Sequence, residues 1–194
     1  MKAFATVLLL FLLHAQVAGA AAKLDVAYAS VERILSLKIL TEGGRHYLQG
    51  GPDDTCAYAF IQEPRVSAVG ERLQIRFLFA ARAGKEVAGK CVGPGDNFDI
   101  VVSGVPSYGN GELFLDELRF EAEHKLFDLF SKLIEGQLTP QMKVRAKPYI
   151  ESYIAELTAF GAGRVSLETL SLQNIELGAS SAVIEADFLI NVQP

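Results

Sequence analysis

Apolar and polar residues alternate through the middle of the chain, between residues 56 and 120. Every second residue from 73 to 79 is large and apolar, and the same spacing returns further on: Leu73, Ile75, Phe77, Phe79, Phe98, Ile100 and Val102. This period of two predicts strands with one apolar face. Asn110-Gly111 separates two such runs and favours a tight hairpin, because both residues tolerate positive φ. Pro64 lacks an amide donor, so we expect its strand to be broken or to lie at an edge.

Helical spacing appears on both sides of this region. A first helix is expected near 30 to 41, with Ser30 as its N-cap. From His124 a broad apolar stripe predicts a second helix: Leu126, Phe127, Leu129, Phe130, Leu133 and Ile134. Thr139-Pro140 is typical of a helix start, and an apolar face continues from Tyr149 to Leu157 with Pro148 expected to kink it. These segments together predict one long, Pro-interrupted helix.

The last thirty residues return to strand spacing, between Val165 and Val192. The order is helix, antiparallel strands, broken helix and strands, which indicates an α+β fold rather than a doubly wound one. The long helix is the natural cover for the apolar sheet face. No repeat and no linker rich in Pro, Gly and Ser divides the chain, so residues 23–194 are expected to form a single domain.

The N-terminus has the pattern of a secretory signal peptide. Lys2 precedes an apolar run from Val7 to Leu13, and small residues follow. Cleavage is expected after Ala20 or after Ala22, and the later site would remove residues 1–22. No Cys follows the apolar run to carry a lipid, and the mature protein is expected to be exported and soluble, in a bacterial periplasm.

Export changes the interpretation of the two cysteines. In an oxidising compartment Cys56 and Cys91 are expected to form one disulfide. The alternative is two buried thiols. A nucleophilic cysteine is a weaker third interpretation, because neither residue has a CxxC partner or an adjacent His.

Composition and motifs remove several classes of function. Half of the 194 residues are hydrophobic, 21% are charged and the formal net charge is -5, which argues against a nucleic-acid partner. No P-loop, GxSxG, GxGxxG or HExxH motif occurs. His46 and His124 are isolated in the sequence, so we expect no enzyme, no metal site and no cofactor. Lys143, Arg145 and Lys147 are expected to form a solvated basic face, or alternatively to meet an anionic lipid head group in a transient membrane contact.

The large apolar side chains of the second helix and of the strand around residue 77 have two explanations. They fill a dry core, or the sheet and the helix leave an apolar cleft for a lipid chain. In the second case the ligand contacts are expected to be Phe77, Phe79, Phe130, Leu133 and Ile134.

The second half of the chain resembles a known family. The segment 111–120, GELFLDELRF, with the apolar helix and the run Lys147-Pro148-Tyr149-Ile150 up to Leu157, is similar to the YceB-like bacterial envelope proteins, a domain of unknown function. The resemblance covers about 111 to 192. It implies a curved antiparallel sheet wrapped on a long helix, half of a tubular lipid-binding (TULIP-like) module, in the cell envelope. Members resemble lipoproteins, whereas this chain lacks the lipidation Cys, and the family supplies no catalytic residues.

Two function hypotheses follow. The first is a non-enzymatic envelope protein that binds a lipid or other apolar small molecule in a cleft between sheet and helix. The alternative is a periplasmic interaction or assembly module with a filled core, whose strand edges or helix bind another envelope protein. A hydrolase is a weak third hypothesis.

Overall fold

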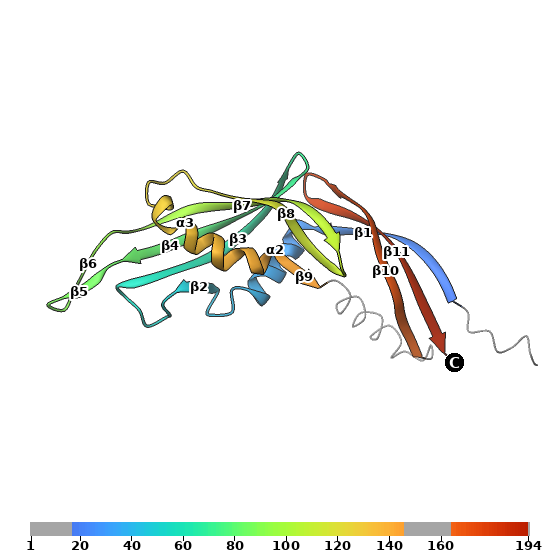
Figure 1. The fold of residues 1–194 in the computed structure, drawn as a ribbon, viewed down its shortest axis with the longest axis horizontal. Coiled ribbons are helices and arrows are strands. Elements are labelled where there is room, and N and C mark those ends of the chain that lie inside the picture. The colour runs from blue at the N-terminus through green and yellow to red at the C-terminus, as the bar shows by residue number, and fades with distance from the viewer. Residues whose placement is uncertain (1–16, 146–163, 194) are drawn as a thin grey trace, which may run out of the picture.

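The computed structural model describes residues 17–145 and 164–193. The molecule is elongated (Figure 1), with a six-stranded sheet and two helices toward one end and a three-stranded sheet toward the other. Strands hold most of the described residues.

The six-stranded sheet is antiparallel throughout and has the order β2-β3-β4-β7-β8-β9. Its strands are β2 (Arg45–Gln49), β3 (Ala57–Val69), β4 (Arg72–Ala83), β7 (Gly95–Gly109), β8 (Glu112–Glu121) and β9 (Lys143–Arg145). The predicted strands of the middle region are therefore confirmed. The predicted hairpin joins β7 to β8, where Asn110 and Gly111 have φ of 53° and 81°.

Pro64 lies inside β3, which is not an edge strand. The pairing of β3 with β4 shifts register between Gln62 and Arg65, so a bulge surrounds the proline. The last pair of β3 with β2 joins Gln62 to Arg45, and Pro64 therefore lies where β2 requires no amide donor. The prediction that this strand is broken or lies at an edge is therefore confirmed by the break in its pairing.

The C-terminal strands form a sheet of their own. This three-stranded sheet has the order β1-β11-β10, from β1 (Val17–Ala27), β11 (Ser181–Gln193) and β10 (Arg164–Leu177). The strands expected between 165 and 192 are confirmed, but they pair with the N-terminus instead of the central sheet. Both predicted cleavage positions lie within β1, and cleavage after Ala22 would keep the pairs from Lys23 with Glu185 to Ala27 with Ser181.

The described helices are short. They are α2 (Tyr28–Lys38), α3 (Phe127–Leu138) and the 3-10 helix η2 (Thr139–Met142). The first helix was expected at 30 to 41 and begins two residues earlier. The predicted α+β fold with a long, Pro-interrupted C-terminal helix is wrong, because the structure is mostly β and α3 ends at Leu138.

The end of α3 has a local cause and a tertiary one. Pro140 has no N–H to donate, and its ring would clash with the carbonyl four residues earlier in a continued helix. Residues 143–145 then pair with β8, Lys143 with Phe114 and Arg145 with Glu112. Strand pairing thus replaces the predicted helix there. The rest of that predicted helix, Tyr149 to Leu157, lies outside the described residues.

A small hairpin extends the far end of the molecule beyond β4 and β7 (Figure 1). Its strands are β5 (Lys85–Val87) and β6 (Lys90–Val92), which pair only with each other among the described strands. The sequence pattern did not indicate this hairpin.

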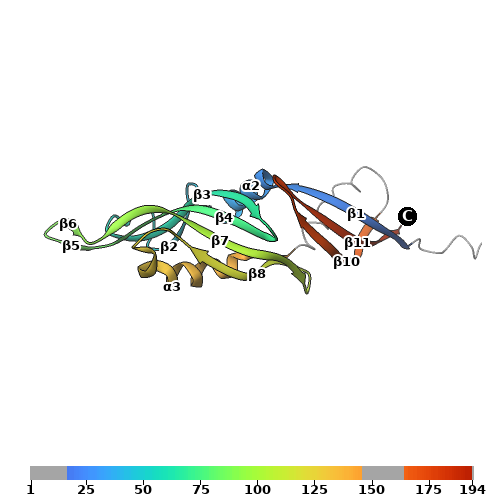
Figure 2. The ribbon, with the colours of Figure 1, turned by 90° about the horizontal axis from the view of Figure 1, so that it is seen from above.

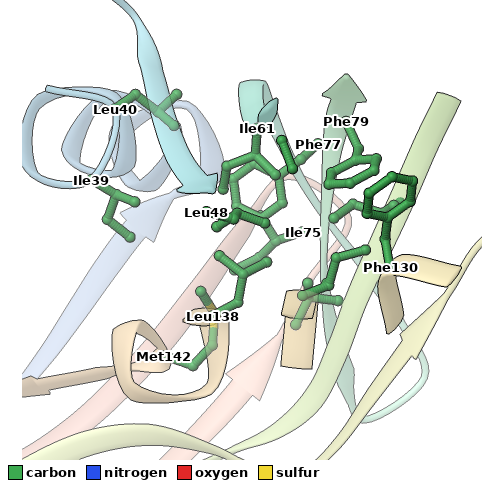
Figure 3. Packing of buried hydrophobic residues seen from close by; sticks show 14 of the residues in the cluster. Ile39, Leu40, Leu48, Ile61, Ile75, Phe77, Phe79, Phe130, Leu138 and Met142 are labelled. Atoms are coloured by element: carbon green, nitrogen blue, oxygen red, sulfur yellow. The ribbon is translucent and has the colours of Figure 1, made fainter. Parts of the chain in front are cut away.

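The core lies between α3 and the curved six-stranded sheet. Helix α3 contacts both β2 and β8, which stand far apart in the sheet order, so the sheet bends around the helix. Figure 2 shows α3 along one side of this sheet. Figure 3 shows the interdigitated side chains, which include Leu48, Ile61, Ile75, Phe77, Phe79, Phe130, Leu138 and Met142.

Candidate functional site

The structure brings the five predicted ligand-contact residues together. Phe77, Phe79 and Ile134 have no exposed surface, Phe130 is 5% exposed, and Leu133 packs against the same cluster. The rings of Phe79 and Phe130 meet edge to face with their centroids 5.4 Å apart (Figure 3). These side chains fill the core, and their role as ligand contacts stays a prediction.

Periodicity explains why these residues meet. Phe77 and Phe79 point to the same face of β4, while Phe130, Ile134 and Leu138 follow one another at four-residue spacing on α3. The predicted helical stripe was too wide, since Leu129 is 59% exposed. The sheet covers only the side of α3 that carries Phe130, so Leu129 faces away from it.

A cleft lies between β8 and the end of α3, and we call it the β8/α3 cleft. Its volume is about 550 Å³, and its lining residues are Leu118, Arg119, Phe120, Glu121, Glu135 and Thr139. The side chains of Leu118 and Phe120 are half-buried and pack against the core. A second depression of about 510 Å³ shares Glu135 and Thr139 and continues past Lys132 and Pro140. The cleft therefore has an apolar floor and a charged rim.

Sequence reasoning missed the lining of this cleft. Leu118 and Phe120 alternate with Arg119 and Glu121, and this spacing was the available signal. It predicts one apolar face for the end of β8. It does not show that α3 stops short of covering that face.

A third cleft, of about 520 Å³, is lined by Phe98, Val101, Ala122 and four charged residues: Arg76, Asp99, Glu121 and Glu123. Arg76 and Asp99 form an ion pair there, with 3.7 Å between Nη1 and Oδ2, and both side chains are more than half exposed. Such a pair contributes little to stability, because water screens it.

His124 precedes α3. Its ring stacks on another ring, and each of its two nitrogens has a polar partner. The ring stacks on Phe98, with centroids 4.2 Å apart and planes 10° from parallel. Its Nδ1 accepts a hydrogen bond from the Leu126 amide at 3.2 Å, and its Nε2 lies 3.3 Å from Oδ2 of Asp96. Both nitrogens thus have a polar partner within the protein.

The remaining candidates from the sequence are His46 and possible metal ligands. His46 lies half-buried in β2 opposite Ile61. Within residues 17–145 and 164–193 no three His, Cys, Asp or Glu side chains gather as metal ligands. Among the described residues, Lys23 and Tyr28 have shifted pKa values, and neither lines one of the three clefts above. A hydrogen bond to Glu185 raises the pKa of Lys23, and burial raises the pKa of Tyr28.

The predicted disulfide is present. The sulfurs of Cys56 and Cys91 are bonded, with their Cα atoms 5.3 Å apart. This bridge is consistent with an oxidising compartment. Among the described helices none is long and apolar enough to cross a membrane.

No family model matches the chain, and no curated protein matches it. The YceB-like resemblance therefore stays a prediction. The structure has the curved antiparallel sheet that the resemblance implies, and within residues 17–145 and 164–193 it contains no long helix.

Proposed function

We propose that this chain is an exported, non-enzymatic envelope protein that binds a lipid or other apolar ligand in the β8/α3 cleft. The observation that carries this proposal is a cleft between sheet and helix whose floor, Leu118 and Phe120, continues into the core. Ligand pockets commonly measure about 300–1,000 Å³, and the cleft falls in this range.

The charges at the rim suit an amphiphile. A hydrocarbon chain would cover Leu118 and Phe120, while its head group would remain in water beside Arg119, Glu121 and Glu135. Covering the apolar floor removes it from water, which favours binding by about 25 cal/mol for each Å² buried. The packed side chains around Phe77 need not move in this arrangement.

The proposal also includes the location of the protein in the cell envelope and its lack of enzymatic activity. The disulfide and the signal-peptide pattern support export to a bacterial periplasm. The absence of P-loop, GxSxG, GxGxxG and HExxH motifs from the sequence supports a binding role over hydrolysis. The resemblance to YceB-like envelope proteins supports the same location.

Native mass spectrometry of the gently purified protein tests the ligand, followed by uptake of a hydrophobic dye after delipidation. We expect a lipid-sized adduct on the parent protein and loss of that adduct in Phe120→Ala. Phe114→Ala is the matched control, because Phe114 is also half-buried in β8 but does not line the cleft. A parent protein with neither adduct nor dye uptake would contradict the proposal.

A second candidate is the interaction module with a filled core. Two observations favour it: the close packing around Phe79 and Phe130, and the outer edge of β1, of which Lys23–Ala27 would remain after cleavage and which pairs with no described strand. An unpaired edge can accept an added strand from a partner protein. This candidate predicts no dye uptake by the parent and no effect of Phe120→Ala on partner binding.

A further inference from the structure

The β5-β6 hairpin presents an exposed face of mixed character at the end of the molecule. Lys85 pairs with Val92 and Val87 pairs with Lys90, and residues opposite each other in an antiparallel pair share a face. We call these four residues the hairpin face. The two valines are 58% and 61% exposed, while the other face carries Glu86 and the disulfide-bonded Cys91.

The base of this hairpin is attached to the start of β3. A two-stranded hairpin alone is marginally stable in water. Here the Cys56–Cys91 bond ties β6 to the residue before β3, and the Gly84 amide donates a hydrogen bond to the Cys56 carbonyl at 2.9 Å. A Cβ on Gly84 would lie 2.5 Å from Sγ of Cys91, so the backbone of Gly84 packs directly against the disulfide. An exposed element is therefore kept ordered without adding to the core.

We propose that the hairpin face rests on an anionic lipid surface. The valines supply apolar surface for the head-group region, and the lysines supply positive charge for lipid phosphates. The hairpin lies at one end of the long axis (Figure 1), beyond the strands that cover the core. Since the chain carries a net charge of -5, contact through the two lysines of the hairpin face presents positive charge to a negative surface.

The small size of the face favours a membrane over a protein partner. A stable protein interface buries about 1,200–2,000 Å² in total, more than two valines and two lysines supply. Weak, reversible attachment to lipid needs only a few inserted side chains and nearby positive charge. Of the basic residues suspected from the sequence, Arg145 on β9 is paired with Glu112 on β8, and Lys147 lies outside the described residues.

Vesicle flotation of the mature chain tests this proposal. We expect binding to vesicles of phosphatidylglycerol mixed with phosphatidylcholine, and much weaker binding to phosphatidylcholine alone. Each of Lys85→Gln and Lys90→Gln should weaken binding about fivefold. The double variant Val87→Ser with Val92→Ser should weaken it about tenfold. All four side chains are exposed, so the variants should unfold as the parent does.

The control variants are Val69→Ser and Lys143→Gln, which change an exposed valine and an exposed lysine elsewhere. Both should float as the parent does. Equal binding to both vesicle types, no binding to either, or hairpin variants that bind like the parent would each overturn the proposal. Phe120→Ala should leave flotation unchanged, so failure of this proposal is distinguishable from failure of ligand binding in the β8/α3 cleft.

Discussion

The hydroxyl of Tyr28 donates a hydrogen bond to the backbone carbonyl of Gly178, 2.9 Å away and 150 residues along the chain. Tyr28 begins α2 and is buried in the core, while Gly178 lies in the turn between β10 and β11. The Tyr28 amide also donates to the Ser180 carbonyl at 2.9 Å. One residue thus joins the core to the three-stranded sheet.

Removing that hydroxyl should weaken the junction. Tyr28→Phe keeps the ring and leaves the Gly178 carbonyl without its side-chain donor, so we expect a loss of about 1 kcal/mol in the free energy of unfolding. Urea denaturation at neutral pH measures it. Tyr58→Phe is the control, because within the described part of the chain no hydrogen bond of its hydroxyl is found, and its stability should match the parent.

The same side chain should make stability depend on pH in the alkaline range. An ordinary tyrosine has a pKa of 10.0, and burial raises the pKa of Tyr28 above that value. The unfolded chain therefore loses this proton first, so the contribution is complete below pH 10.0 and disappears as pH rises through the folded-state pKa. Urea midpoints between about pH 9 and pH 11 should fall less steeply for Tyr28→Phe than for the parent.

Truncating the core side of α3 should be costly. Phe130→Ala removes a ring that is 5% exposed and contacts Phe79, so we expect a loss of about 3 to 5 kcal/mol. Leu129→Ala is the control at the neighbouring, exposed position and should change stability by less than about 0.5 kcal/mol. Equal losses in the two variants, measured by chemical denaturation, would show that the orientation of α3 is incorrect.

Replacing both cysteines should destabilise the protein through its unfolded state. The Cys56–Cys91 bond closes a loop of 35 positions, and the chain-entropy estimate for such a loop is about 4 kcal/mol. We expect the double variant Cys56→Ser with Cys91→Ser to lose about this amount. A reductant should lower the unfolding midpoint of the parent and leave that of the double variant unchanged.

Two glycine substitutions should act in opposite directions. Gly84→Ala would place its Cβ 2.5 Å from Sγ of Cys91, and we expect a loss of about 1 to 3 kcal/mol. Gly136 lies exposed in α3 with open space around it, so Gly136→Ala should gain up to about 1 kcal/mol by restricting the unfolded chain. Thermal unfolding of the two variants checks both signs.

Local patterns in the sequence determined much of the central sheet. The alternation from Leu73 to Phe79 defines the buried face of β4, and Asn110-Gly111 defines the hairpin between β7 and β8. Both signals depend only on residues close in the chain, since a strand's apolar face and a turn's positive φ are local properties. The even cysteine count and the signal-peptide pattern similarly predicted the Cys56–Cys91 bond.

Only the tertiary structure decided which conformation follows α3, which strands pair and where a cleft remains. Residues 143–145 suit a helix or a strand, and pairing with β8 selects the strand. Val17–Ala27, assigned in part to a signal peptide, pairs with β11 across the length of the chain. The cleft at Leu118 and Phe120 depends on where α3 stops along β8. These outcomes depend on contacts between distant segments, which hydrophobic periodicity does not encode because it records burial and not the partner.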